Sequence, residues 1–286
     1  MIRPARTRLA AALALLLTGA VGCAAADSST DMSASGTCAK DKLRLVTHGQ
    51  LTIGTDKPAY EPWYKNDDPA GGQGYEAAVA YAVAEDLGFR RDEVKWTVVA
   101  FNDSYKPGRK KFDFDINQIS ITADRAKTVT FSDGYYTVNQ AVVALNNSPI
   151  ANVSTIADLR NARLGTQVGT TALTFIDQVV KPRVRPVTFV DTDHAKQAMA
   201  AGQVNGIVTD LPTAFYLTSA EIENSRIVGQ FEPQGGSTEQ FGLLFEKNNP
   251  LVNCVNQALT ELRSTGELQR LEDTWLAESA GAPRLG

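Results

Sequence analysis

The chain alternates between apolar spacings typical of strands and apolar spacings typical of helices. Strand-like runs lie at residues 50–55, 94–100, 114–121, 141–145, 163–167, 187–190, 206–210 and 241–245. Helical spacing is found at residues 75–87, 171–180, 191–201, 251–265 and 267–276, and Pro212 begins a further helix. This alternation predicts an α/β fold with mostly parallel sheets covered by helices.

Turn residues divide this pattern into two parts. Gly88 and Gly202 each follow a helical run as a stop signal. Residues 146–149 (NNSP) form a turn and a candidate boundary between two lobes. The chain from about residue 42 to residue 281 is long enough for two lobes. It has no repeat of 20–50 residues, so the pattern is not that of a solenoid.

The first residues have the features of an export signal. Arg3, Arg6 and Arg8 form a positive region directly before an apolar run at residues 9–17. That run is too short to span a bilayer comfortably as a permanent helix. We therefore predict a signal peptide at residues 1–22.

A cysteine follows this segment directly. Residues 20–23 (AVGC) place small residues before Cys23, which resembles the bacterial lipobox, although Ala20 stands where Leu is usual. In that motif the Cys is acylated and becomes the new N-terminus; the alternative is ordinary secretion with an unmodified Cys23. Residues 24–36 are rich in Ser, Ala, Asp and Thr, so we predict a lipid-anchored flexible tether at residues 23–41.

The other two cysteines suggest a disulfide. If Cys23 carries lipid, Cys38 and Cys254 are left as a pair, and an exported protein can keep a disulfide. We predict that this bond fastens the N-terminal segment to the C-terminal helix.

Charge and histidine content exclude two classes of partner. The formal net charge is −4, whereas a nucleic-acid-binding surface requires a basic patch. His48 and His194 lie far apart and lack the spacing of metal ligands. We therefore expect no nucleic acid, no metal and no other cofactor.

Seven segments occur in an order that is known from one family. They are residues 53–63 (IGTD and YEPW), 74–76 (GYE), 112–127 (FD and ISITADRAK), 131–136 (FSDGYY), 168–171 (VGTT), 208–212 (VTDLP) and 266–275. Together they resemble the bacterial extracellular solute-binding proteins of family 3, which bind polar amino acids. The chain departs from the family at Asn117 and Gln118, where a small residue and Gly are usual, and Gln118 is expected to reach into the cleft.

The resemblance implies a two-lobe periplasmic-binding-protein fold of type II with two crossover hinge strands. Lobe 1 is then residues 42–145 and 237–281, and lobe 2 is residues 146–236. The expected protein is a monomer of the cell envelope that captures a polar amino acid by hinge closure. It would deliver this ligand to the membrane permease of an ABC importer.

A zwitterionic ligand needs opposite charges and hydrogen bonds in its site, because burying either charge alone is costly. Arg125 is the candidate for the α-carboxylate, which a guanidinium grips with two parallel bonds. Asp210 follows a buried strand, where open α/β sheets place ligands, and is the candidate for the α-ammonium; it also suits a helix cap. Thr170 and Thr171 begin a helix and would share the carboxylate, and Ser120 would add hydrogen bonds.

The family resemblance also implies the side-chain pocket. Tyr60, Trp63 and Phe101 match its aromatic walls, although each could be plain core. Asp56 matches a position that meets the distal nitrogen of the ligand in relatives that bind glutamine or basic amino acids, and Gln167 lies on the pocket wall. We expect glutamine or a basic amino acid, with cystine or another polar amino acid as alternatives.

Two other functions stay open at this point. The fold also hosts cyclohexadienyl dehydratases, which act on prephenate or arogenate and need an acid or base such as Asp56 or Glu61. No catalytic triad is visible in the sequence, so we do not expect an enzyme. A sensory ligand-binding domain normally continues into a membrane helix, whereas this chain ends soon after Leu276.

Overall fold

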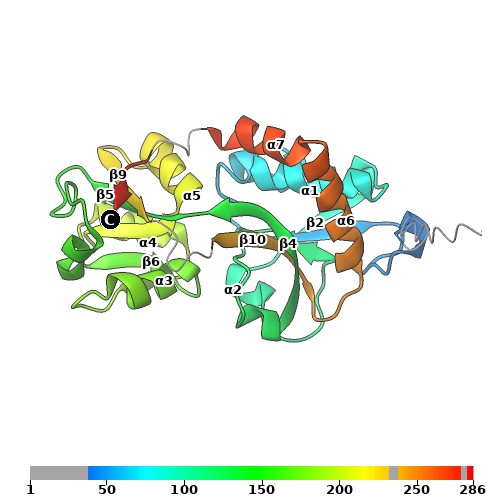
Figure 1. Cartoon of the computed structure of the whole chain (residues 1–286), viewed down its shortest axis with the longest axis horizontal. Coiled ribbons are helices and arrows are strands. Elements are labelled where there is room, and N and C mark those ends of the chain that lie inside the picture. The colour runs from blue at the N-terminus through cyan, green and yellow to red at the C-terminus, as the bar shows by residue number, and fades with distance from the viewer. Residues whose placement is uncertain (1–37, 232–237, 278–281, 286) are drawn as a thin grey trace, which may run out of the picture. The chain divides into compact units, whose positions relative to one another are not determined.

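Two mixed sheets organise the computed structural model (Figure 1). It describes residues 38–231, 238–277 and 282–285, all within one unit that spans residues 35–286. The predicted signal peptide, the predicted lipidation site Cys23 and most of the predicted tether lie outside the described residues. So does the predicted lobe boundary at residues 236–237.

The first sheet has five strands in the order β2-β1-β3-β10-β4. They are β1 (Leu51–Thr55), β2 (Val94–Val98), β3 (Phe114–Asp115), β4 (Val129–Val138) and β10 (Glu239–Glu246). β1 runs parallel to β2 and β3, and β10 runs antiparallel to β3 and β4. Because β1 and β3 are parallel, their carboxyl ends reach the same edge of the sheet. The sheet and its helices are called the first lobe below.

The second sheet has six strands in the order β11-β9-β5-β8-β6-β7 and belongs to the second lobe. They are β5 (Gln140–Leu145), β6 (Leu164–Gln167), β7 (Val187–Phe189), β8 (Gly206–Asp210), β9 (Ser225–Phe231) and β11 (Arg284–Leu285). β6 runs parallel to β7 and β8, and β5 runs antiparallel to β8 and β9. β11 adds a parallel edge strand beside β9.

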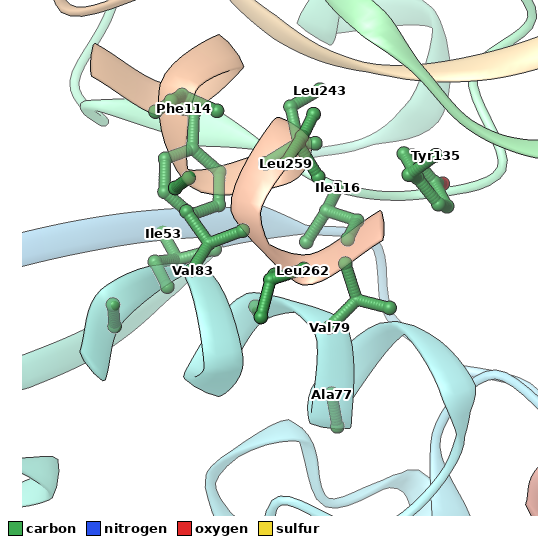
Figure 2. Close-up of a cluster of buried hydrophobic side chains, with 14 of the residues drawn as sticks. Ile53, Ala77, Val79, Val83, Phe114, Ile116, Tyr135, Leu243, Leu259 and Leu262 are labelled. Carbon is green, nitrogen blue, oxygen red and sulfur yellow. The ribbon is translucent and has the colours of Figure 1, made fainter. Parts of the chain in front are cut away.

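The helices α1 (Tyr75–Asp86), α6 (Leu251–Ser264) and α7 (Glu267–Trp275) pack against one another over the first sheet (Figure 1). Their apolar faces make the larger core. Figure 2 shows Val83 and Leu259 gathered with Ile53 and Phe114 of the strands, and all four are fully buried. Each such side chain contributes roughly 1.5–3 kcal/mol by leaving water.

A disulfide closes the start of the described chain onto this helical layer. Cys38 is bonded to Cys254 of α6, across 216 positions of sequence, with the two Cα atoms 5.4 Å apart. The predicted pairing is confirmed. Cys254 is also part of the buried core, so the bond is sheltered at that end.

The structure changes several of the predicted elements. The predicted strand 114–121 is interrupted: β3 ends at Asp115, Gln118 has a φ of +47°, and pairing resumes only as a single antiparallel bridge between Ser120 and Phe241. The predicted helix 171–180 is an α-helix, α3 (Thr171–Phe175), that continues as a π-helix at Ile176–Val180. The strands β4 and β9 and the short helix α2 (Phe101–Ser104) were not predicted. The shorter helices α4 (Thr192–Ala200) and α5 (Leu211–Tyr216) fall where helices were expected.

The chain passes between the two sheets three times. It leaves the first sheet at Asn139, between β4 and β5, and it returns between β9 and β10. After α7 it crosses again, since β11 pairs with β9. Two crossover connections were expected, and the first lies at Asn139 instead of at the predicted boundary at residues 146–149, because β5 pairs within the second sheet.

Candidate functional site

A pocket opens where strand ends of both sheets meet. Its walls come from the first lobe, from the start of β5, and from the loops and helices that follow β6, β7 and β8. The lining residues are Asp56, Pro58, Tyr60, Phe101, Asn117, Gln118, Ser120, Gln140, Thr166, Gln167, Thr170, Thr171, Ala172, Thr192, Ala195, Ile207, Val208, Thr209, Asp210, Thr213 and Phe241. The cavity measures about 70 Å³, and its lining holds two carboxylates but no basic side chain.

Direct contacts join the two lobes around this pocket. The indole N–H of Trp63 donates to Thr213 Oγ1 at 2.9 Å. Ser120 Oγ lies 3.2 Å from Thr171 Oγ1. Gly169 has φ +79°, and a Cβ there would lie 2.1 Å from Asn102 Oδ1, so only glycine allows this close approach to α2.

Asp210 lies at the carboxyl end of β8 and caps α5. Its Oδ1 accepts a hydrogen bond from the backbone N–H of Thr213 at 2.8 Å, so it has both the predicted pocket position and the predicted cap. Burial raises the pKa of Asp210 to about 6, and the nearby carboxylate of Glu239 adds to the rise, while the Thr213 bonds oppose it. A cation beside Asp210 would remove this cost.

Asp56 follows β1 and closes another side of the pocket. Its oxygens accept from the backbone N–H groups of Lys57, at 2.7 Å, and of Phe101, at 3.1 Å. Burial raises the pKa of Asp56, and these two bonds oppose the rise. The bond to Phe101 also fixes the start of α2, which carries an aromatic wall of the pocket.

Gln118 is held in place at the pocket by a buried glutamate. Its backbone N–H donates to Glu76 Oε1 at 2.6 Å, and its side-chain amide also donates to Glu76. Tyr135 donates to the same carboxylate, and burial raises the pKa of Glu76 to about 7. The left-handed backbone at Gln118 explains why Gly is usual at this position of the family signature.

Arg125 lies behind the pocket wall and is not among the lining residues. Its guanidinium donates to the backbone oxygens of Ser120, at 2.8 Å, and Gly169, at 2.9 Å, one from each lobe. It also lies over the rings of Phe101 and Tyr105, at 5.3 and 4.8 Å from their centroids. In this structure the planar guanidinium therefore joins the two lobes through backbone carbonyls.

Three buried polar atoms at the pocket have no hydrogen-bond partner: Tyr60 Oη, Asn117 Nδ2 and Gln140 Oε1. Leaving such an atom unpaired costs about 1–3 kcal/mol. Among them are hydroxyl, donor and acceptor atoms, so together they can pair with a ligand that both donates and accepts. This fits a polar ligand rather than an apolar one.

Most of the predicted site residues come together. Asp56, Tyr60, Phe101, Gln118, Ser120, Gln167, Thr170, Thr171 and Asp210 all line the pocket. Trp63 does not: it is fully buried against Tyr75, Tyr136 and Phe241, so its placement is that of the core. Trp63 contacts the pocket lining through the hydrogen bond from its indole N–H to Thr213.

Sequence reasoning missed several pocket residues. Asn117, Gln140, Thr192 and Thr213 line the cavity, and Glu239 contacts three of the pocket's polar groups from behind. The signal that could have found Gln140 is a polar residue at the start of an apolar strand. Glu239 carries no local signal, because its partners lie 68 to 119 positions away.

Asp115, which had no explanation from sequence, is fully buried in β3, and neither of its carboxyl oxygens has a partner. Burial and the carboxylates of Glu76 and Asp56 raise the pKa of Asp115 well above its usual range. A Cβ on Gly54 would lie 2.5 Å from Asp115 Oδ2, so the glycine makes room for this side chain. Asp115 does not line the pocket.

In residues 38–231, 238–277 and 282–285, no helix combines the length and apolar character needed to cross a membrane. Within the same residues, no three His, Cys, Asp or Glu side chains are grouped so that they could hold a metal ion.

Known proteins resemble this chain over most of its length. Residues 51–278 match the family described as bacterial extracellular solute-binding proteins, family 3. The L-cystine-binding protein TcyJ of Escherichia coli (strain K12) is 28% identical and covers 81% of this chain and 84% of its own. The arginine-binding extracellular protein ArtP of Bacillus subtilis (strain 168) is 25% identical, with 79% and 86% covered.

Solved structures agree with this comparison. An ancestral arginine-binding protein bound to arginine has a TM-score of 0.67 at 27% identity, with 79% of this chain and 98% of that chain covered. The arginine-, lysine-, histidine-binding protein ArtJ of Geobacillus stearothermophilus has the same TM-score at 21% identity, with 80% and 95% covered. The predicted two-lobe α/β fold and the family resemblance are confirmed.

Proposed function

The chain belongs to the bacterial extracellular solute-binding proteins, family 3, and from that premise we propose that it binds a polar amino acid between its lobes. One observation carries the proposal: the cavity between the sheets is lined by Asp210, Asp56 and three unpartnered buried polar atoms. A buried carboxylate and unpaired polar atoms cost free energy as long as they lack partners. A ligand that forms hydrogen bonds or ion pairs with them removes this cost.

The proposed pose places the α-ammonium of the ligand against Asp210, whose pKa is raised by burial and by the nearby Glu239, so that a cation beside it is favourable. The α-carboxylate would face the start of α3, where the N–H groups of Thr171 and Ala172 have no acceptor within the helix. Arg125 lies directly behind that wall through its bonds to Ser120 and Gly169. It would supply the positive charge that balances the carboxylate.

The charge of the lining favours a basic amino acid. Two carboxylates and no basic side chain face the cavity, so a ligand with an additional cation gains more than a neutral one. The distal cation would lie near Asp56, with Tyr60 and Phe101 on the aliphatic part of the ligand. Glutamine and cystine rank behind on this argument.

We propose that closure of the lobes on the ligand gives the form that docks on the permease of an ABC importer. A ligand that touches Ser120 in the first lobe and Asp210 in the second stabilises only the closed state. The predicted export signal and Cys23 support a location outside the cytoplasm on a lipid anchor. Relatives named as periplasmic or extracellular binding proteins support the location.

A thermal-shift screen with the twenty amino acids and L-cystine tests the proposal. A ligand at 100 times its Kd stabilises the folded state by about 2.7 kcal/mol, so one amino acid should raise the unfolding temperature clearly. Asp210→Asn should reduce that shift strongly, whereas Asp158→Asn, which alters a remote exposed cap, should keep it. If no amino acid shifts the wild-type transition, the proposed function is wrong.

An enzyme of the dehydratase kind has less support. Both carboxylate oxygens of Asp56 accept hydrogen bonds from backbone N–H groups. Glu61 accepts from the backbone N–H of Asn66 and does not line the pocket. One structural relative, at 27% identity, is titled an ancestral amino acid-binding protein and a precursor of cyclohexadienyl dehydratase. Incubation with prephenate and arogenate, with product absorbance as the readout, distinguishes the two functions.

A further inference from the structure

Glu239 lies at the start of β10, where the chain re-enters the first sheet, and it faces the back of the pocket wall. Its Oε1 accepts from Ser120 Oγ at 2.5 Å and from Thr171 Oγ1 at 2.6 Å. Its Oε2 accepts from Gln140 Nε2 at 3.1 Å. All three partners line the pocket, and Glu239 itself does not.

Counting protons fixes the direction of these bonds. A carboxylate can only accept, and each hydroxyl has one proton to donate. Ser120 and Thr171 therefore direct their protons at Glu239. The two hydroxyl oxygens also lie 3.2 Å from each other. Because both of their protons are directed at Glu239, neither hydroxyl has a proton left for the pocket. Each hydroxyl is then left with lone pairs only, and Thr171 Oγ1 uses one of them to accept from Gln140 Nε2 at 3.4 Å.

We propose that Glu239 is a positioning and specificity-determining residue, which turns the hydroxyls of Ser120 and Thr171 into acceptors for the ammonium of the ligand and leaves the backbone N–H groups at the start of α3 for its carboxylate. The inference rests on the proposed amino-acid function and adds to it a residue outside the lining. It also assigns the hydroxyls of Ser120 and Thr171 to the ammonium end of the ligand, whereas the sequence had suggested that Thr171 shares the carboxylate.

The geometry of the wall supports this assignment. Asp210 is close enough to Glu239 for the two carboxylates to repel, which adds to the raised pKa of Asp210. An ammonium placed among Asp210, Ser120 and Thr171 meets one charge and two acceptor oxygens. A carboxylate placed there would meet the same groups as repulsive neighbours.

Glu239→Gln is the direct test. The amide offers one acceptor oxygen and one donating NH2 group, so at least one hydroxyl must turn its proton toward the pocket. Calorimetry with L-arginine, with L-cystine and L-glutamine measured beside it, should show about a tenfold loss of affinity, equal to about 1.4 kcal/mol. Glu246→Gln, at the other end of β10 and outside the pocket, is the matched control and should keep the wild-type affinity.

A double-mutant cycle separates this role from a general effect of charge or structure. In a Ser120→Ala, Thr171→Val background the hydroxyls are gone, so Glu239→Gln should change affinity less than twofold. A loss of similar size in both backgrounds overturns the proposal, as does an unchanged affinity in the single variant. If the Gln variant does not fold, Glu239→Asp is used in the same cycle, with the same expected disappearance of its effect.

The same measurements distinguish a failure of the proposed amino-acid function from a failure of the proposed role of Glu239. If wild-type protein binds none of the probes, the proposed function fails, and the role of Glu239 fails with it. If wild-type protein binds a probe and the cycle is additive, only the role of Glu239 is wrong.

Discussion

The raised pKa of Asp210 makes amino-acid binding sensitive to acid. The perturbation is a change from pH 7.5 to pH 5, with L-arginine as the probe, because the charges of arginine do not change in this range. A ligand ammonium holds Asp210 in its ionised form, so a proton and the ligand compete for the same carboxylate. The measured Kd should then rise by the factor 1 + 10^(pKa − pH).

With a pKa of about 6 for Asp210, this factor is about 1 at pH 7.5 and about 11 at pH 5. Calorimetry should therefore report about a tenfold weaker Kd at pH 5, with a slope approaching one decade per pH unit. Asp210→Asn should bind more weakly and show a flat profile, and Asp158→Asn should follow the wild type. A wild-type Kd that stays within twofold across the range, or an equal slope in Asp210→Asn, refutes the reasoning.

Three further predictions follow from other parts of the structure. Arg125→Ala should lose about 2–5 kcal/mol of ligand affinity, because a buried charge with bonds to both lobes is removed; calorimetry on protein shown to be folded by circular dichroism checks this, and an unchanged affinity contradicts it. Replacing Cys38 and Cys254 with Ser should lower the free energy of unfolding by about 2–5 kcal/mol in urea titrations, and an unchanged urea midpoint would exclude a stabilising bond. The folded-state pKa of Asp115 is raised, so the free energy of unfolding of the wild type should fall as pH rises above about 4, by up to about 1.4 kcal/mol per pH unit. Asp115→Asn should lack this loss. Urea midpoints that move in parallel with pH in both proteins would rule this out.

The local sequence was sufficient to predict both an element and a site position where a buried strand is followed directly by a polar residue. The apolar run before Asp210 predicted β8 and the pocket position of its carboxylate together. It was insufficient for β4, whose burial does not alternate, since the pairing with β10 is interrupted at two places near Gly242. A strand with such irregularities has no period of two for sequence reasoning to find.

The site shows the same division. Family position indicated Trp63 as well as Tyr60, but only the fold decides which aromatic side chain faces the cavity and which one packs against Phe241. Glu239 was out of reach because its function depends on three long-range contacts at once. Charge and spacing along the chain contain no information about the direction of a hydroxyl proton.

The third passage of the chain bears on how the lobes can move. β4 pairs with β10 in the first sheet and β5 pairs with β9 in the second, so the strands that flank the first two passages are neighbours, and a joint of this kind permits both bending and twisting. β11 adds a separate attachment to the edge of the second sheet, with Leu285 buried there after α7 has packed on the first lobe. This attachment resists rotation about the long direction of the hinge strands. The lobes should therefore open mainly by bending at the hinge and only slightly by twisting.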